Sequence, residues 1–172
     1  MNSIFARVSD RQYTDQPIDR RDMRLILRAA FCAPSSRNRQ PLELIVVKDK
    51  AMLEKLSEVS PYATPVKGSA MTIVVCANTE RNDLIGACVE DCAAATENML
   101  IEATELHIGS CWIGCWPHEE RTALLARYMK TPANIRPLWM VSFGYPVHKA
   151  SPKDKWSEEK ISYEAYGQKE PD

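Results

Sequence analysis

The residues of this sequence that could do chemistry begin near its N-terminus. Arg7-Val8-Ser9-Asp10-Arg11 places two guanidinium groups and one hydroxyl within a short segment. Arginine binds phosphate through paired N–H donors, and a serine hydroxyl adds one more hydrogen-bond donor. The first 40 residues hold most of the arginines of the chain and no lysine, so this type of donor is concentrated there. The spacing indicates a site for a phosphate monoester.

A second polar segment lies at residues 33–41 and reads Ala-Pro-Ser-Ser-Arg-Asn-Arg-Gln-Pro. Its hydroxyl and amide side chains offer the donors and acceptors that the pyrimidine edge or the ribityl chain of a flavin would use. The same side chains would also satisfy the backbone of an ordinary loop that ends a helix. Taken alone, the segment favours the second interpretation.

Other reactive patterns do not form a recognisable site. The pairs Cys88-x3-Cys92 and Cys111-x3-Cys115 could be imagined as four metal ligands, but zinc and iron–sulfur sites usually place at least one close pair on a turn. Here one pair falls within a predicted helix and the other on a predicted strand, so we predict no metal. His118-Glu119 begins like a zinc protease motif, yet Thr122 stands where its second histidine is required. The 6 glycines form neither a dinucleotide-binding fingerprint nor a serine hydrolase elbow.

The composition restricts the class of protein further. The chain has 172 residues, of which 45% are hydrophobic and 26% charged, as is usual for one globular domain. Its net charge of -1 argues against a nucleic-acid partner, which usually requires a surplus of positive charge. The longest apolar stretch, residues 71–77, is too short to cross a membrane, and charged residues stand where a signal peptide needs an apolar run. We expect a cytoplasmic protein without membrane or nucleic-acid partners.

The pattern of apolar residues predicts helices that alternate irregularly with strands. Asp19 is placed to cap a helix at residues 19–30, which ends before Pro34. Residues 71–76 are apolar on both faces, as expected of a strand in the centre of a sheet. The other predicted elements are strands at 44–48, 111–115 and 138–143, helices at 51–59, 83–107 and 119–130, and a loop at 61–68.

These elements predict an α/β fold, an α+β sandwich of three layers in which helices flank a mixed, mainly antiparallel sheet. The helix at 83–107 is apolar nearly all round, so we expect it to be buried against the sheet or a partner subunit. After Tyr145 the chain turns polar and has too few apolar residues for a core of its own. We predict a single domain over residues 1–172, in which residues from about 150 onward form a tail that wraps the partner.

The order of these segments resembles the FMN-dependent nitroreductase family. The resemblance covers about 150 residues in the correct order, and such collinearity is more specific than any single motif. It departs from the family pattern at Val8, Leu42 and Lys155, where a basic residue, an aromatic residue and an arginine are usual. The matching segments are Arg7-x-Ser9-x-Arg11-x-Tyr13, the polar segment at 33–41, the helix at 91–103, the strand at 109–114, the turn at 143–146 and Lys153-x-Lys155.

The resemblance implies an obligate homodimer that binds two FMN molecules at the subunit interface. Arg7, Ser9, Arg11, Lys153 and Lys155 of one subunit would hold the phosphate and the ribityl chain. The polar segment would reach the flavin from the other subunit. Its residues that would contact the flavin are Pro34, Ser35, Ser36, Asn38 and Gln40.

Three more residues have roles that the resemblance implies. Lys67 would lie near the N1–O2 edge of the flavin, where a cation favours the anionic reduced form. Ile113 and Gly114 would offer backbone contacts near flavin N5. No side chain is predicted to be a catalytic acid or base, because the cofactor carries the chemistry and the protein supplies position and electrostatics.

The implied activity is that of a flavin-dependent NAD(P)H oxidoreductase with a ping-pong mechanism. NADPH or NADH would transfer a hydride to flavin N5 and leave, and a small-molecule acceptor such as a nitroaromatic or a quinone would then enter the same cleft. Two alternatives stay open: a non-catalytic FMN-binding or sensor protein on the same fold, and a metal or redox protein based on the cysteines.

Overall fold

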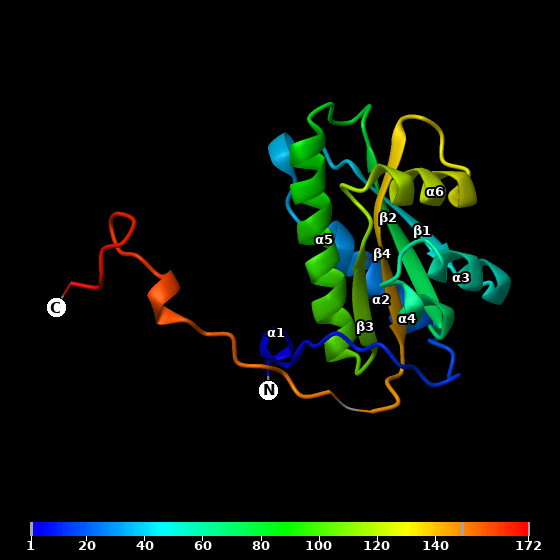
Figure 1. The fold of residues 1–172 in the computed structure, drawn as a ribbon, viewed down its shortest axis with the longest axis horizontal. Helices are drawn as coiled ribbons and strands as arrows, with labels where there is room; N and C mark the ends of the chain where they lie inside the picture. Colours follow the sequence, from blue (N-terminus) through cyan, green and yellow to red (C-terminus); the bar gives the residue numbers. More distant parts are fainter. Residues whose placement is uncertain (1, 149, 172) are drawn as a thin grey trace.

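The computed structural model describes residues 2–148 and 150–171, and four strands form one sheet within them (Figure 1). The strands lie in the order β1-β2-β4-β3, with bounds Leu42–Val47, Met71–Asn78, Ile135–Gly144 and Gly109–Gly114. The helices are α1 (Ser3–Ala6), α2 (Arg20–Phe31), α3 (Lys50–Ser57), α4 (Thr64–Lys67), α5 (Ile85–Glu105) and α6 (Glu119–Met129), and single 3-10 turns occur at Ser36–Asn38 and Glu158–Lys160.

The sheet is antiparallel at each of its three strand pairs, so the expectation of a mixed sheet was wrong for these strands. Helix α5 carries the chain back across the sheet, and β2 and β3 therefore run in the same direction. They do not pair, because β4 lies between them and runs opposite to both. A parallel contact occurs outside the named strands, at an isolated bridge between Ser9 and Ser110.

Helices cover both faces of the sheet, which gives the three predicted layers (Figure 1). Alternate residues of β2 point to opposite faces because side chains alternate along a strand. Ile73 and Val75 pack with residues of α2 and α5 on one face. Val74 and Cys76 pack with residues of α3, α4 and α6 on the other face. As predicted from its two apolar faces, β2 is central in the sheet and almost fully buried.

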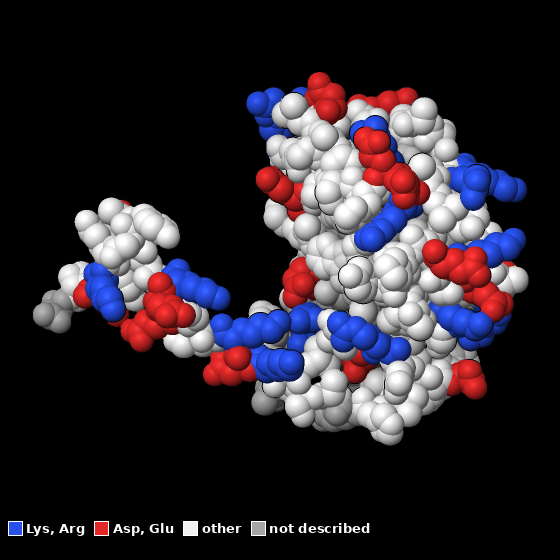
Figure 2. Space-filling view, viewed as in Figure 1, with Lys and Arg blue, Asp and Glu red and all other residues white. Residues whose placement is uncertain are grey.

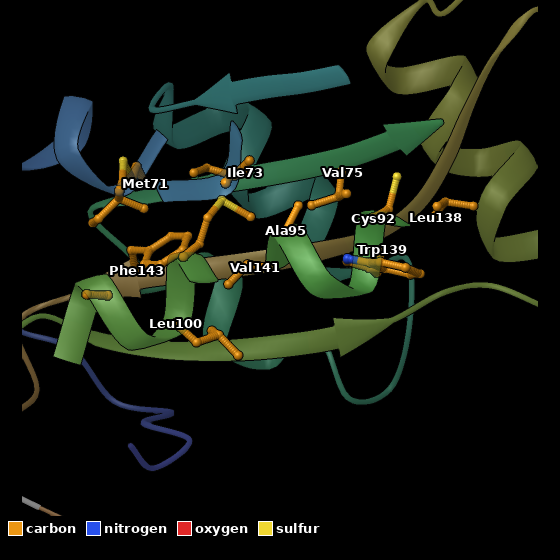
Figure 3. Packing of buried hydrophobic residues seen from close by; sticks show 14 of the residues in the cluster. Met71, Ile73, Val75, Cys92, Ala95, Leu100, Leu138, Trp139, Val141 and Phe143 are labelled. Carbon is orange, nitrogen blue, oxygen red and sulfur yellow. The ribbon is translucent and has the colours of Figure 1, made fainter. Parts of the chain in front are cut away.

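The core between α5 and the sheet holds the largest buried side chains of that face (Figure 3). Phe143 and Met99 are completely buried there, and Trp139 donates its indole N–H to Thr96 Oγ1 at 2.9 Å. Thr96 in turn donates to the backbone carbonyl of Cys92 at 2.8 Å. The single polar group that the indole brings into this core is thus hydrogen-bonded, as buried polar groups require.

Local signals in the sequence explain where several helices begin. The carboxylate of Asp19 accepts hydrogen bonds from the backbone N–H groups of Arg21 and Asp22, at 2.6 and 3.0 Å, and so caps α2 as predicted. The expectation of a loop over residues 61–68 was wrong in part, because Thr64–Lys67 forms α4. Pro65 lies in the first turn of this short helix, where its missing N–H costs no hydrogen bond.

The segment after β4 leaves the body of the molecule and extends away from it (Figure 1). Trp156 and Tyr166 of this segment are exposed by 74% and 102%. As the polar composition predicts, the segment forms no core of its own within the described residues. None of the helices described in residues 2–148 and 150–171 is both long enough and apolar enough to cross a membrane.

We expect substitution of Phe143 by alanine to lower the free energy of unfolding by about 3–5 kcal/mol, because it empties a large fully buried site. Phe31→Ala is the matched control, since Phe31 is 66% exposed and its loss should change the free energy by about 0.5 kcal/mol or less. Urea unfolding of both variants measures the difference. Equal losses in the two variants would contradict the described core.

Candidate functional site

The N-terminal segment that carries Arg7, Ser9 and Arg11 lies across the ends of β3 and β4. Asp10 donates its backbone N–H to the carbonyl of Ser110 at 2.9 Å, beside the bridge between Ser9 and Ser110. Farther along, Thr14 donates its backbone N–H to the carbonyl of Tyr145 at 2.8 Å. The segment is therefore fixed to the sheet by main-chain bonds, which leaves its side chains free to bind a ligand.

Tyr13 fastens the same segment from inside. Its hydroxyl donates to the carbonyl of Asp10 at 2.6 Å and lies 2.9 Å from Ser142 Oγ. Burial raises the pKa of Tyr13, so the phenol stays protonated and keeps its donor. Gly144 makes this close approach possible, because a Cβ there would lie 2.8 Å from Tyr13 side-chain atoms. The N-terminal segment that carries Arg7, Ser9 and Arg11 is thus held by packing as well as by backbone hydrogen bonds.

The structure brings the two predicted phosphate-binding segments together in one groove. A hollow of about 990 Å³ is lined by Arg7, Ser9 and Arg11 and, from the start of the C-terminal segment, by residues 150–156. Lys153 and Lys155 are among these lining residues. Figure 2 shows the Lys and Arg side chains gathered where the C-terminal segment leaves the body of the molecule. We call this hollow the basic groove.

The charges of the basic groove are mostly available to a ligand. Arg7 Nε lies 3.6 Å from Glu97 Oε1 of α5, and Arg11 donates from Nη1 to the carbonyl of Ser9 at 3.1 Å. Neither Lys153 nor Lys155 forms an ion pair with another residue in the part of the chain that the structure describes. Four cations therefore face the groove with Asp154 as the acid among its lining residues, an arrangement suited to a phosphate dianion.

The polar segment between α2 and β1 forms a tight loop beside a second hollow. The backbone of three non-glycine residues lies in the left-handed region, at φ values of 51° for Arg37, 54° for Asn38 and 49° for Gln40. This conformation costs roughly 1–2 kcal/mol for each such residue, so other contacts have to hold the loop. Ser35 Oγ accepts from the backbone N–H of Gln40 at 3.0 Å, and Gln40 Nε2 donates to Asn38 Oδ1 at 3.0 Å.

The second hollow has a volume of about 400 Å³ and is lined by Pro34, Ser35 and Gln40 together with Arg81 and Asp91. We call it the loop hollow. Asp91 of α5 holds the loop in place, because its Oδ1 accepts the backbone N–H of Ser36 at 2.8 Å. Arg39 adds a contact from its Nη1 to Asp83 Oδ1 at 3.3 Å.

The two hollows are separate in one protomer. Their contacts with α5 fall at Asp91 for the loop and at Glu97 for Arg7. Six helical residues correspond to about 9 Å along the axis and to a rotation of roughly 120° between the two side chains. The two sets therefore meet α5 at different levels and on different sides of the helix, and the two hollows share no lining residue.

The remaining predicted residues lie elsewhere. Lys67 of α4 is exposed and pairs with Glu54 of α3 at 2.5 Å, and this hydrogen bond raises the pKa of the lysine. Ile113 points its side chain into the core on the α3 and α6 side, which leaves only its backbone for contact with a ligand. Gly114 ends β3 and is exposed. The structure therefore gathers the predicted phosphate residues and the predicted loop residues into two groups, and places Lys67 in neither.

Sequence reasoning missed two acids of α5 that contact these groups. Glu97 faces Arg7, and Asp91 faces the backbone of Ser36. The available signal was that both are acids on a mostly apolar helix, where a charged side chain requires either solvent or a polar partner. Only the fold shows which partner each acid meets.

The cysteines do not gather into a metal site. In residues 2–148 and 150–171 no group of three or more His, Cys, Asp or Glu side chains could hold a metal ion. Cys88 and Cys92 lie within α5, as predicted, and Cys111 lies on β3. Burial raises the pKa of five thiols, of Cys76 to about 12 and of Cys115 to about 11.

We expect one fast-reacting thiol in the folded protein when it is titrated with an aromatic disulfide reagent at neutral pH. Cys32 is exposed, whereas the five buried thiols keep their protons because their pKa values are raised, and only the thiolate attacks. All 6 cysteines should react after unfolding in guanidinium chloride. Several fast-reacting thiols in the folded protein, or metal that copurifies with it, would instead support the hypothesis of a cysteine-based protein.

Comparisons with known proteins give the same fold and relate the chain to enzymes. It matches the model of the nitroreductase family over residues 4–88 and 62–145. A protein of Archaeoglobus fulgidus, named as a candidate NADH dehydrogenase/NAD(P)H nitroreductase, is 39% identical over 173 residues, which cover 100% of this chain and 94% of that protein.

Two solved structures are similar along nearly the whole chain. The crystal structure of a candidate NADH dehydrogenase/NAD(P)H nitroreductase from Parabacteroides distasonis has a TM-score of 0.92 at 33% identity and covers 95% of this chain and 96% of its own. A candidate nitroreductase from Desulfovibrio desulfuricans, crystallised in complex with FMN, has a TM-score of 0.82 at 27% identity and covers 95% of each chain.

Proposed function

Because the chain belongs to the nitroreductase family, we propose that it is an FMN-dependent NAD(P)H oxidoreductase that reduces nitroaromatic, quinone or related acceptors by a ping-pong mechanism. The observation that carries the proposal is the basic groove, in which residues from the two ends of the chain converge. The similar protein crystallised with FMN supports the choice of cofactor. When bound, FMN accepts a hydride from NADPH or NADH and delivers electrons to the acceptor in a separate half-reaction.

The groove residues fit the phosphate of FMN. Arg7 and Arg11 offer forked N–H donors, and Ser9 offers a hydroxyl between them. Lys153 and Lys155 add point charges from the facing C-terminal segment. Glu97 limits the rotation of the Arg7 side chain, which lowers the entropy that binding has to remove.

The flavin ring requires donors and acceptors for its pyrimidine edge, and the loop at 34–40 offers them. Ser35, Asn38 and Gln40 already bond to one another, so their orientations are largely set before a ligand binds. Lys67 has an exposed partner, Glu54, from which it would have to separate to reach a flavin. The role of Lys67 near the N1–O2 edge, and the backbone contacts of Ile113 and Gly114 near N5, stay predictions.

We propose further that the protein acts as a homodimer in which the loop of one subunit completes the site of the other. This assembly is supported by the separation of the loop hollow from the basic groove within one protomer. It would also cover Trp156 and Tyr166, two exposed aromatic residues of the C-terminal segment, which extends away from the body (Figure 1). The single domain over residues 1–172 and the wrapping of its tail around the partner stay predictions of this proposal.

The visible absorption spectrum of the purified protein tests the function, with NADPH and then NADH added without oxygen. We expect a flavin spectrum that bleaches with at least one of the two nucleotides and returns when an acceptor is added. A flavin spectrum that stays oxidised would identify a non-catalytic FMN-binding or sensor protein instead. A colourless protein that cannot be reconstituted with FMN would refute the proposal.

Replacing Arg11 by alanine tests the basic groove directly. A charge-assisted hydrogen bond to the phosphate is lost, so the dissociation constant of FMN should rise about 10- to 100-fold. Binding of riboflavin, which lacks the phosphate, should stay the same in wild type and variant. The control is Arg28→Ala on the exposed face of α2, which should change neither constant. An equal loss of affinity for both flavins would show that Arg11 acts on something other than the phosphate.

A further inference from the structure

The loop over residues 35–40 needs an anchor outside itself. Three of its residues hold positive φ values, and the contacts among Ser35, Asn38 and Gln40 stay within the loop. Such internal bonds fix the shape of a loop but not its position on the fold. Its ends are fixed by α2 and β1, whereas the position of its middle depends on bonds to another element that is held by the core.

Asp91 provides that bond from a rigid element. The neighbouring residues Cys88, Cys92 and Ala95 are buried against the sheet, so the backbone of α5 at this level is held by the core. Oδ1 of Asp91 accepts the N–H of Ser36 at 2.8 Å, and Ser36 begins the 3-10 turn in the loop. Arg39 makes two longer contacts with this region, from Nη1 to Oδ1 of the buried Asn82 at 3.5 Å and to Oδ1 of the exposed Asp83 at 3.3 Å. The first is at the limit of a hydrogen bond, and exposed ion pairs such as the second contribute little.

The second oxygen of Asp91 is unusual. Oδ2 is buried and has no hydrogen-bond partner among the described residues, although the side chain lines the loop hollow. Burying a charged oxygen without a partner is unfavourable, so the carboxylate has to be compensated by the bond that its other oxygen forms. A bond from an N–H to a carboxylate is stronger than one to a neutral acceptor, which suits the main anchor of a strained loop.

We propose that Asp91 is the positioning residue that holds the Ser35–Gln40 loop in the shape that presents its side chains to FMN. The inference rests on the proposed function, because it assigns the loop to the flavin. Asp91 itself need not touch the cofactor. It acts through the backbone N–H of Ser36, on the ring side of the cofactor rather than at the phosphate.

Three variants separate this role from others. Asp91→Ala removes the acceptor, Asp91→Asn keeps an amide oxygen in its place, and Glu90→Ala removes the neighbouring exposed acid of α5 as a control. Asp91→Ala should weaken binding of FMN and of riboflavin equally, about 10-fold or more, since a lost charged hydrogen bond has that effect. It should also change the visible circular dichroism of the bound flavin. Asp91→Asn should restore most of the affinity, and Glu90→Ala should behave as wild type.

The same bond can be removed from its other end. Ser35 is extended (φ -138°, ψ 151°) and Ser36 is the first residue of the turn, so proline is compatible with position 36 and deletes only its N–H donor and its hydroxyl. Ser36→Ala, which keeps the N–H, is the matched reference. Ser36→Pro should bind flavin more weakly than Ser36→Ala. Combining Ser36→Pro with Asp91→Ala should weaken binding little beyond either substitution alone, because both remove the same hydrogen bond.

Several results would overturn the proposal. One is an unchanged affinity and circular dichroism of the flavin in Asp91→Ala. Another is an Asp91→Asn variant as weak as Asp91→Ala, and a third is full additivity of Asp91→Ala with Ser36→Pro. A loss of affinity explained by a lower unfolding temperature of the apoprotein would also overturn it. A wild-type protein that binds no FMN refutes the proposed function instead, which keeps the two failures distinct.

Discussion

The packing of α5 against β2 and β4 is the constraint on which the rest of the structure depends. This interface buries Cys92, Ala95 and Leu100 against the sheet, so α5 cannot shift without opening the core (Figure 3). The outward residues of the same helix meet both candidate binding segments, at Asp91 and at Glu97. A third contact, between Ser3 and Glu105, fastens the start of the chain to the end of the helix. One rigid helix therefore sets the positions of segments that lie far apart in the sequence.

Rigidity of this kind matters more for a flavoprotein than for an enzyme that relies on its own acids and bases. The cofactor supplies the reaction, so the protein contributes position and charge, and both are lost if the binding residues move. The N-terminal segment satisfies this need by bonding its backbone to Ser110 of β3 and to Tyr145 just after β4, and by packing Tyr13 closely against Gly144. The loop after α2 satisfies it differently, through a strained backbone held from outside. A strained backbone of this kind persists only where several surrounding contacts hold it in place.

The sequence predicted the parts of the fold and of the site that depend on local chemistry. The cap at Asp19 followed from its side-chain oxygen and is confirmed. The arginines and serine of residues 7–11 line one hollow with the two lysines, and their binding of phosphate stays a prediction. Pairing between distant strands was not readable in the same way. The strand β4 lies between β2 and β3, and its own residues do not indicate which strands it will pair with. Asp91 was missed for a similar reason, since an acid on a helix looks solvated until the fold places Ser36 against it.

The two ends of the chain depend on each other through the charge of the basic groove. Arg7, Arg11, Lys153 and Lys155 line one hollow, and like charges at such distances repel one another unless an anion lies between them. Beyond Pro146 the chain buries little apolar surface, so the body of the protomer does little to hold the lysines opposite the arginines. A bound phosphate would turn this repulsion into attraction and would order the C-terminal segment at the same time. Because a ligand that binds only the ordered state stabilises that state by mass action, the proposed phosphate binding and the placement of the tail would be one linked equilibrium. In the proposed site the tail would then be positioned by the ligand that it helps to bind, so a polar segment without a core of its own could still contribute.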